Sequence, residues 1–426
     1  MAAISPVFAF SVPPTGDASI GELRWRAGVI RIAISPSLLR ESSNIKSDSD
    51  VAGAIRRSID SWSRVANVEL RQVSSEKLSV SPSGPTGDGV SLITIAQTPE
   101  NVLLFAKDPE GAAATTRIFY NRRGLITEAD IVLNPYQQFS TDGTIGTFDL
   151  ESTLTHEIGH LLGLPHSEVL GATMHASYGK NGIFGMQRLT SRTLATDDIA
   201  SIRSIYGARE DSECCGRIDG KLLVPGKHAR AIEVWVEDFF GRVHGSTKVG
   251  ATGDFAFAGL REGKYRLFAH EPARTRNSIA AQEVGVASVT SGETSAVTAK
   301  VVTGGSQVDF GLTRLGFNGQ LSQVAVAATP GRSYIVYLGG RNLDVKDISI
   351  GFNSPDLSVV QSSIRSLDYG EDISVVSFEV RVSARAKHGE YTLFAELRGS
   401  DRRAMIGGIT VDNFFAPGSS FATFDD

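Results

Sequence analysis

Cysteine is nearly absent from this sequence of 426 residues. The only two cysteines are neighbours, Cys214 and Cys215, so the chain has no framework of disulfide bonds of the kind that stabilises small secreted domains. A bond between adjacent cysteines would close a strained ring, far from the usual separation of paired cysteines. We therefore expect two partly buried thiols at a domain junction, with a redox switch as the alternative.

Long apolar runs and an excess of positive charge are missing as well. No uninterrupted apolar stretch reaches about 18 residues, so we expect no membrane span. The net charge is −5 without any long basic run, which gives no reason to expect nucleic acid or an anionic membrane as a partner. Residues 1–17 carry no basic residue before their apolar part and make a poor signal peptide. Either another segment directs export or the protein stays inside the cell.

The chain is too long for one ordinary domain, and its residue pattern changes along its length. The first part mixes helices with strands, whereas the rest has short alternating strands and glycine turns, which are typical of β-sandwiches. We predict a multidomain chain, with an α+β domain followed by two β-sandwich (Ig-like) domains. The predicted divisions are an N-terminal extension (1–22), the α+β domain (23–208), the two β-sandwiches (214–302 and 315–412) and a flexible tail (413–426).

Residue periodicity predicts the elements of the α+β part. Arg24–Ser35 alternates as one strand, and Thr115–Asn134 alternates as a hairpin. A helix follows the polar residues 47–50, because apolar residues then recur on one face: Val51, Ile55, Ile59 and Trp62. Near the end of this part, Thr196 is the expected cap of another helix.

Histidine first occurs at position 156 and opens the stretch HEIGHLLGLPHS. The pattern from Asp149 to Leu162 predicts a helix with Asp149 as its cap. His156 and His160 are four residues apart and lie one turn above each other, so both imidazoles can reach one ion. Glu157, beside the first histidine, can reach water at the metal rather than the metal itself.

The residues that follow this helix predict a third ligand. Gly163 lies where the helix must stop, and glycine can take the left-handed conformation that turns the chain sharply. Pro165 discourages a return to helix, so the turn can carry His166 back to the metal. Three protein ligands leave a fourth position for water, which marks a catalytic rather than a structural zinc site.

These residues match the HExxHxxGxxH signature of metzincin peptidases at every position. Ser167, Met174 and Tyr178 are similar to the matrixin branch of that group, and so is the closing stretch LATDDIASIRSIYG. The resemblance covers about Leu23 to Gly207. It implies an α+β metzincin (zincin-like) fold and a zinc-dependent metalloendopeptidase, which acts on protein or peptide substrates.

The resemblance also assigns roles to residues. It implies one catalytic zinc ion with three ligands and a general base: His156, His160 and His166, with Glu157 as the base. An extended substrate would lie antiparallel to the edge strand Thr115–Tyr120, and the segment between Met174 and Thr196 would shape the pocket beyond the cleaved bond. Asp197 or Asp198 would form a hydrogen bond beneath the turn at Met174.

The chain departs from animal matrixins in ways that limit the resemblance. Because all eight histidines lie at or beyond His156, none is available for a second, structural zinc ion, and no calcium loop is recognisable between Asp108 and Asn134. Calcium is therefore unsupported as a cofactor. No cysteine precedes the domain to form a cysteine switch, and His175 replaces the usual tyrosine.

The β-rich parts resemble binding or spacer modules. Thr252–Ala269 is similar to the carboxypeptidase-regulatory-like (prealbumin-like) fold, and GGRNL at 339–343 is similar to a turn of IPT/Ig-like domains. Their expected roles are attachment to a cell surface, to extracellular polymers or to a substrate. With a secreted or cell-surface peptidase as the main hypothesis, the alternatives are a surface adhesion or scaffold protein with a catalytically silent metzincin domain and a zinc amidase.

Overall fold

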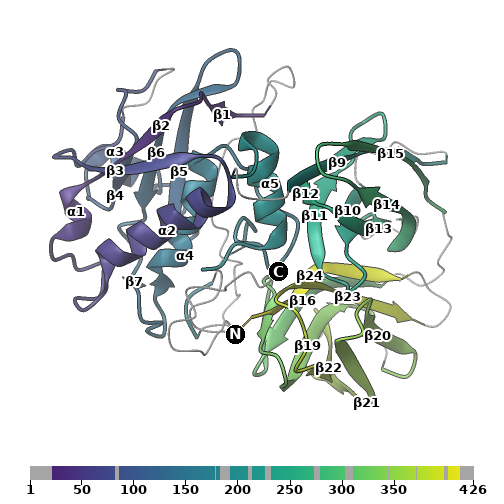
Figure 1. Cartoon of the computed structure of the whole chain (residues 1–426). Coiled ribbons are helices and arrows are strands. Elements are labelled where there is room, and N and C mark those ends of the chain that lie inside the picture. Colours follow the sequence, from purple (N-terminus) through teal and green to yellow (C-terminus); the bar gives the residue numbers. More distant parts are fainter. Residues whose placement is uncertain are drawn as a thin grey trace.

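The computed structural model describes residues 22–412 except for 82–85, 178, 183–191, 210–213, 226–231, 273–278, 303–309, 344, 371 and 398–401. Within the described residues, a part that contains helices comes first and a β-rich region follows, as the sequence predicts (Figure 1). The predicted tail, and the predicted extension apart from Glu22, lie outside the described residues.

A six-stranded sheet forms the centre of the first part. Its strands are β1 (Arg24–Trp25), β2 (Val29–Ile34), β3 (Glu69–Ser74), β4 (Leu92–Thr94), β5 (Ala114–Tyr120) and β6 (Leu125–Leu133). Five of them lie in the order β1-β6-β4-β2-β3 and pair in parallel, while β5 pairs antiparallel with β6. The predicted hairpin is confirmed, and β5 is an edge strand in the described part of the chain.

The stretch Arg24–Ser35, which we expected to be one strand, forms two. The strand β1 pairs with Leu125 and Ile126 of β6, whereas β2 pairs with β3 and β4. Gly28 lies between them with a φ of 131°, which residues with a side chain rarely adopt. The alternating pattern therefore continues through a point where the chain changes its partner strands.

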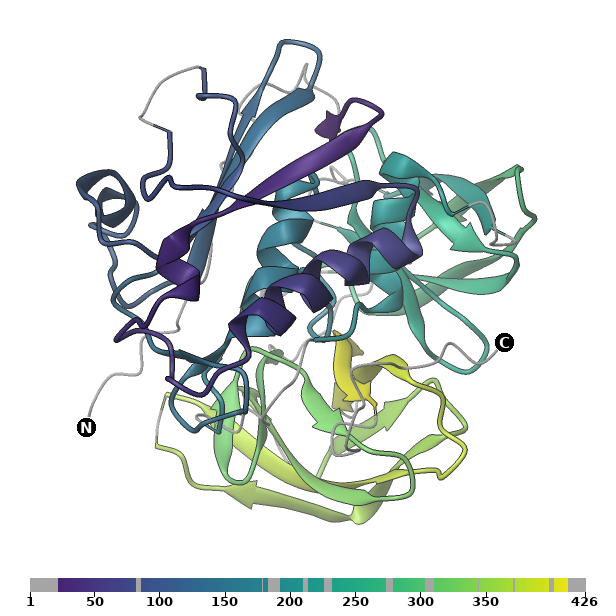
Figure 2. The same ribbon diagram turned by 60° about the vertical axis from the view of Figure 1, so that its left-hand side comes forward.

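The helices of this part are α1 (Pro36–Leu39), α2 (Val51–Val65), α3 (Pro99–Leu103), α4 (Leu150–Leu161) and α5 (Thr196–Tyr206), and a short pair of strands is formed by β7 (Phe139–Ser140) and β8 (Phe148–Asp149). Asp50 caps α2 by accepting a hydrogen bond from the amide of Gly53 at 2.9 Å. The apolar face of α2 is buried as predicted. Trp62 donates to the carbonyl oxygen of Thr155 at 2.9 Å, so α2 and α4 lie side by side (Figure 2).

The cap of α5 differs from the prediction by one residue. Ala195 is the cap and Thr196 is already helical. The side chain of Asp198 accepts the Ala195 amide at 2.8 Å, which is the half of a capping box that the third helical residue supplies, and not the bond expected of a threonine hydroxyl at the cap. The hydroxyl of Thr196 instead donates to the carbonyl oxygen of Val243, outside the helix.

Strands β9–β15, which we call the first β-unit, form two sheets around one buried core that includes Ile218, Val234 and Leu267. The sheet orders are β11-β10-β13-β14 and β12-β9-β15. The strands are β9 (Cys214–Leu223), β10 (Glu233–Glu237), β11 (Val243–Lys248), β12 (Asp254–Arg261), β13 (Gly263–His270), β14 (Gln282–Val289) and β15 (Thr294–Lys300). Two facing sheets are what the alternating pattern predicts.

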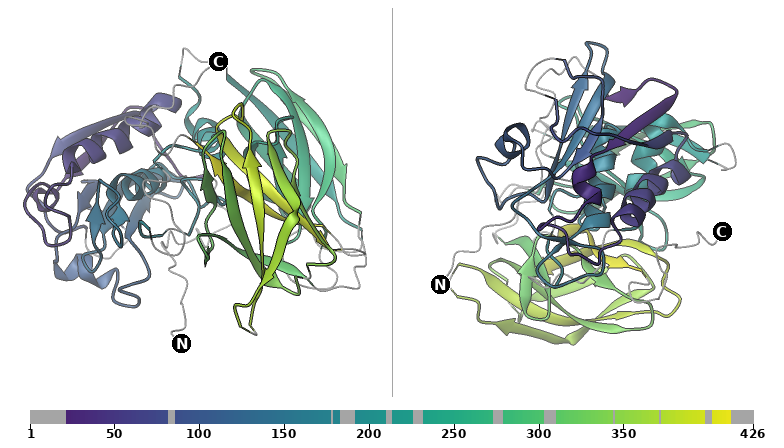
Figure 3. Two further views of the ribbon diagram at one scale, coloured as in Figure 1. Left: turned by 90° about the horizontal axis from the view of Figure 1, so that it is seen from below. Right: turned by 90° about the vertical axis from the view of Figure 1, so that its left-hand side faces the viewer.

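Strands β16–β24, which we call the C-terminal β-unit, form two more sheets around a separate core that includes Val336, Phe378 and Leu393. The sheet orders are β17-β16-β19-β22-β21 and β18-β24-β23-β20. The strands are β16 (Gly311–Phe317), β17 (Gln320–Ser322), β18 (Val326–Ala328), β19 (Ser333–Arg341), β20 (Ile348–Phe352), β21 (Leu357–Leu367), β22 (Ser374–Val382), β23 (Gly389–Leu397) and β24 (Arg403–Val411). Figure 3 shows the two β-units side by side.

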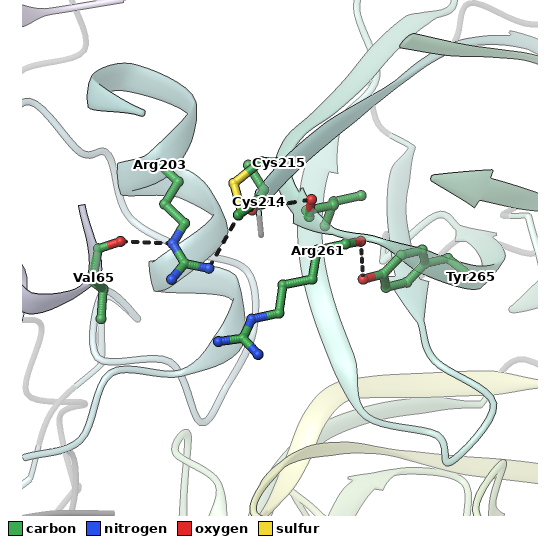
Figure 4. The surroundings of a disulfide bond; sticks show 8 residues. Val65, Arg203, Cys214, Cys215, Arg261 and Tyr265 are labelled. Carbon is green, nitrogen blue, oxygen red and sulfur yellow. Dashed lines mark hydrogen bonds between the residues drawn. A yellow bond between two sulfur atoms is a disulfide. The ribbon is translucent and has the colours of Figure 1, made fainter. Parts of the chain in front are cut away.

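The two cysteines are joined by a disulfide bond, so the expectation of two free thiols is wrong. The peptide bond between Cys214 and Cys215 is cis, and their Cα atoms lie 3.1 Å apart rather than the 3.8 Å of a trans peptide. Their expected place at a junction is correct, because Cys214 begins β9 and lies 3.6 Å from the guanidinium of Arg203 on α5 (Figure 4).

None of the helices in the described residues is both long and apolar enough to cross a membrane.

Candidate metal centre

The helix α4 places two of the candidate ligands. Asp149 caps it, as predicted, by accepting the amide of Ser152 at 2.8 Å, and Arg192 binds the same carboxylate at 2.6 Å. Leu154 and Ile158 are fully buried in the core beneath α4. His156 and His160 project from the helix toward the third histidine, because their spacing puts them one turn apart on the same side.

The third candidate ligand follows a sharp turn at Gly163. This glycine has a φ of 99°, and a Cβ atom there would lie 2.2 Å from the carbonyl oxygen of Leu23. Only glycine satisfies both the conformation and the space. The turn brings His166 back to the helix, with its Nε2 atom 3.1 Å from that of His160.

The three histidines form one cluster, as predicted. One ligand atom of each, from His156, His160 and His166, lies within 4.8 Å of the other two. Nitrogen ligands around a tetrahedral zinc ion lie roughly 3.3 Å from one another, given a zinc–nitrogen distance of about 2.0–2.1 Å. The cluster therefore has the donor set of a zinc site, and the 3.1 Å between the Nε2 atoms of His160 and His166 is close to that spacing.

Backbone carbonyl groups orient the two helical imidazoles. The Nδ1 atom of His156 lies 2.6 Å from the carbonyl oxygen of Thr173, and that of His160 lies 2.8 Å from the carbonyl oxygen of Leu164. An Nδ1–H that donates to a carbonyl leaves the Nε2 lone pair for a metal, which is the usual outer support of a metal-bound histidine. Sequence patterns carry no signal for these carbonyl groups, because any residue supplies one.

Burial also keeps the candidate ligands neutral. It lowers the pKa of His160 to about 3 and that of His166 to about 4, and it lowers the pKa of His156 well below its usual range. Repulsion from neighbouring histidines adds to the effect in each case. Neutral imidazole is the form that binds zinc, so the chain does not have to remove protons from these residues near neutral pH.

Glu157 is fully buried beside the cluster. The hydroxyl of Thr116, on β5, donates to its Oε2 atom, while the Oε1 atom has no hydrogen-bond partner among the described residues. Burial raises the pKa of Glu157 to about 8, and the bond from Thr116 opposes that rise. No sequence pattern singles out Thr116 as a partner of Glu157, because the two residues lie far apart along the chain.

Two aspartates support the turn at Met174. The side chain of Asp198 accepts the amides of Thr173 at 2.8 Å and Met174 at 3.0 Å, which confirms the prediction that Asp197 or Asp198 lies beneath this turn. Asp197 accepts a hydrogen bond from the hydroxyl of Ser167 at 2.6 Å. Burial, followed by the charge of Asp197, raises the pKa of Asp198 to about 7.

Met174 packs directly against α4. A Cβ atom at Gly159 would lie 2.3 Å from the sulfur of Met174, so the helix has no room for a side chain at that position. The ring of His175 lies 3.2 Å from the carbonyl oxygens of both Ser167 and Gln323, as a hydrogen-bonded loop residue. Tyr178, and residues 183–191 of the segment predicted to shape the pocket, lie outside the described residues.

The helix-containing first part of the chain matches a known protein family in sequence. The matrixin family (Peptidase_M10) matches residues 25–207. Residues 25–207 are a matrixin domain. The sheet with its antiparallel edge strand, the histidine helix and the turn at Met174 all belong to this domain.

The matrixin domain is similar to plant metallopeptidases. Metalloendoproteinase 1 of Glycine max is 29% identical over 190 residues, which cover 43% of this chain and 53% of that protein. Metalloendoproteinase 1-MMP of Arabidopsis thaliana is 28% identical over 191 residues, which cover 44% of this chain and 45% of that protein. The chain thus spans about half the length of these curated relatives. A solved DUF3823 family protein of Bacteroides uniformis covers 45% of this chain at 12% identity, but its TM-score of 0.17 is too low to carry an argument.

Proposed function

We propose that this chain is a zinc metalloendopeptidase that hydrolyses peptide bonds of protein substrates. The observation that carries the proposal is the cluster of three neutral imidazoles with a buried carboxylate beside it: His156, His160, His166 and Glu157. The matrixin domain and the metalloendoproteinase names of its relatives support the same function.

The histidines would hold one zinc ion. When bound, zinc supplies a Lewis acid that polarises the scissile carbonyl group and lowers the pKa of water toward about 7. The orientation of His156 and His160 by the carbonyl groups of Thr173 and Leu164 fixes the position of their Nε2 atoms.

Glu157 would act as general base. Its Oε1 atom accepts the proton of the attacking water and later gives it to the leaving nitrogen, while Thr116 holds Oε2. A proton acceptor must be ionised, whereas burial raises the pKa of this carboxyl group to about 8. Glu157 would be ionised more readily beside positive charge held by the histidines.

The substrate would bind along β5. This strand pairs with β6 on one side and is an edge in the described residues, so its other side offers backbone groups to an extended peptide. Thr116 of the same strand contacts Glu157, which brings the edge next to the base. An antiparallel peptide on β5 therefore passes the metal cluster.

The chain outside the matrixin domain would serve attachment. We propose that the chain is divided into domains as the sequence predicts, with β-sandwiches over 214–302 and 315–412. These two modules would bind a substrate, a cell surface or an extracellular polymer. A secreted or cell-surface location follows from that role.

Cleavage of casein by the purified full chain tests the function, with and without 1,10-phenanthroline. We expect Glu157→Gln to keep zinc and to lower kcat/KM by about 10²–10⁴-fold, the usual contribution of a general base. Glu69→Gln, at an exposed glutamate on β3, is the matched control and should cleave normally. A wild-type chain that binds one zinc ion and cleaves nothing at any pH would favour the scaffold alternative.

A further inference from the structure

The segment that joins the third histidine to the turn at Met174 has backbone partners in the C-terminal β-unit. We call residues 167–175 the metal loop. The amide of Leu170 donates to the carbonyl oxygen of Ile406 on β24 at 2.9 Å, and the carbonyl oxygen of Leu170 accepts the amide of Ala325 at 3.4 Å. The metal loop is neither helix nor strand, and some of its backbone groups bond within the loop, whereas those of Leu170 bond to the C-terminal β-unit.

Two glycines bring the metal loop and β24 into close contact. A Cβ atom at Gly171 would lie 2.1 Å from the hydroxyl oxygen of Thr410 and 2.8 Å from Cγ of Glu390. A Cβ atom at Gly407 would lie 2.4 Å from a methyl group of Val169. A methyl group at either glycine would push the loop and the strand apart, because real Cβ atoms do not approach other atoms so closely.

The same loop contributes to a buried core that all three parts of the chain share. Val169 is fully buried in it. The members of this core are Val169, Ala172 and Ala195 of the matrixin domain, Trp235, Val243 and Phe268 of the first β-unit, Ala281 of that unit, and Phe394 and Ile406 of the C-terminal β-unit. Figures 1 and 3 show the C-terminal β-unit next to both other parts. Removing this unit would expose Val169 to water.

The metal loop is also directly connected to two of the histidines. It begins at Ser167, the residue after His166, and the carbonyl oxygen of Thr173 accepts the Nδ1 hydrogen of His156 at 2.6 Å. A displacement of the loop would therefore move one ligand through the backbone and release the orientation of another.

We propose that the C-terminal β-unit is a positioning part of the zinc site. It fixes the metal loop through Leu170, Gly171 and Val169, and so sets the affinity of the three histidines for zinc. This inference rests on the proposed zinc site, and it goes beyond attachment, because it gives the unit a role at the metal. Substrate attachment through other faces of the unit is compatible with it.

Metal affinity of the full chain tests the proposal without any substrate. Gly171→Ala places a methyl group against Thr410 and Glu390, and we expect it to weaken zinc binding by about tenfold or more, as loss of outer support does at metal sites. Competition with a chromogenic chelator gives the affinity, and the absorption spectrum of the Co²⁺ form should report an altered ligand geometry. Gly351→Ala is the matched control, because a Cβ atom on β20 there meets nothing within 4 Å. Equal zinc affinity in Gly171→Ala and wild type overturns the proposal.

A second pair of variants applies if Gly171→Ala does not fold. Phe394→Leu trims the shared core, whereas Phe378→Leu trims the separate core of the same unit. Both should lower Tm, but only Phe394→Leu should weaken zinc binding and change the Co²⁺ spectrum. Equal effects of both variants on zinc affinity would refute positioning through the shared core. A wild-type chain that binds zinc but cleaves no protein sinks the peptidase proposal alone, whereas a chain that binds no zinc sinks both.

Discussion

Removal of the Thr116 hydroxyl tests how the matrixin domain sets the ionisation of Glu157, the proposed base. This hydroxyl donates to Oε2 of Glu157 and also lies 3.2 Å from the carbonyl oxygen of Glu157. Thr116→Val keeps the shape of the side chain and removes the donor. A hydrogen bond to a charged group contributes about 1.5–3 kcal/mol. Because one pKa unit corresponds to about 1.4 kcal/mol, the pKa of Glu157 should rise by about 1–2 units.

The assay is the pH dependence of kcat/KM for the zinc-loaded chain on a fluorogenic peptide. Since the ionised carboxylate accepts the proton, the acid limb of the profile should move to higher pH by about 1–2 units, and the rate below that limb should fall about tenfold per unit. The zinc content should stay the same. Thr115→Val is the control, because neighbouring residues of a strand point to opposite faces. An acid limb that does not move in Thr116→Val would refute the reasoning.

Three further predictions concern stability. Gly163→Ala should lower the free energy of unfolding by about 1–3 kcal/mol in urea titrations, because alanine disfavours a φ of 99° and its Cβ atom would meet the carbonyl oxygen of Leu23; a fully stable variant would contradict this. Burial raises the pKa of Asp130 to about 7 from 3.8, so between about pH 4 and 7 the folded state keeps a proton that the unfolded state has lost, and stability falls as pH rises. The unfolding free energy of Asp130→Asn minus that of wild type should therefore increase by about 1.4 kcal/mol per pH unit from pH 5 to 7, and a flat difference would exclude a raised pKa. Removal of zinc by a chelator should lower Tm, because saturation at a hundred times the Kd stabilises a folded protein by about 2.7 kcal/mol, and His160→Ala should abolish the dependence on zinc.

The β-rich region is where the expectation from the sequence and the contacts in the structure differ most. Alternating strands and glycine turns predict β-sandwiches, but they do not say which surfaces of those sheets face the matrixin domain. The contacts of Leu170 with Ile406 and Ala325 join residues more than a hundred positions apart. Such pairings depend on the shape of both partners and leave no periodic trace in either segment.

Features that depend only on neighbouring residues were predictable from the sequence. Asp149 was recognisable as a cap and Gly163 as a turn, because a helix start and a left-handed glycine each need only neighbouring residues. Where a local rule failed, a distant or conformational factor decided. Asp198 reaches back to the amide of Ala195, so Thr196 is not the cap.

The sequence by itself determined which residues form the candidate metal centre. The intervals between His156, His160 and His166 bring three imidazoles together through one helix and one turn, which are short-range structures. Only the tertiary structure decided how that site is supported. The Thr116 hydroxyl on Glu157, the Thr173 carbonyl on His156 and the C-terminal β-unit on the metal loop all arise from packing between distant segments, whose contacts form only when the complete chain has folded.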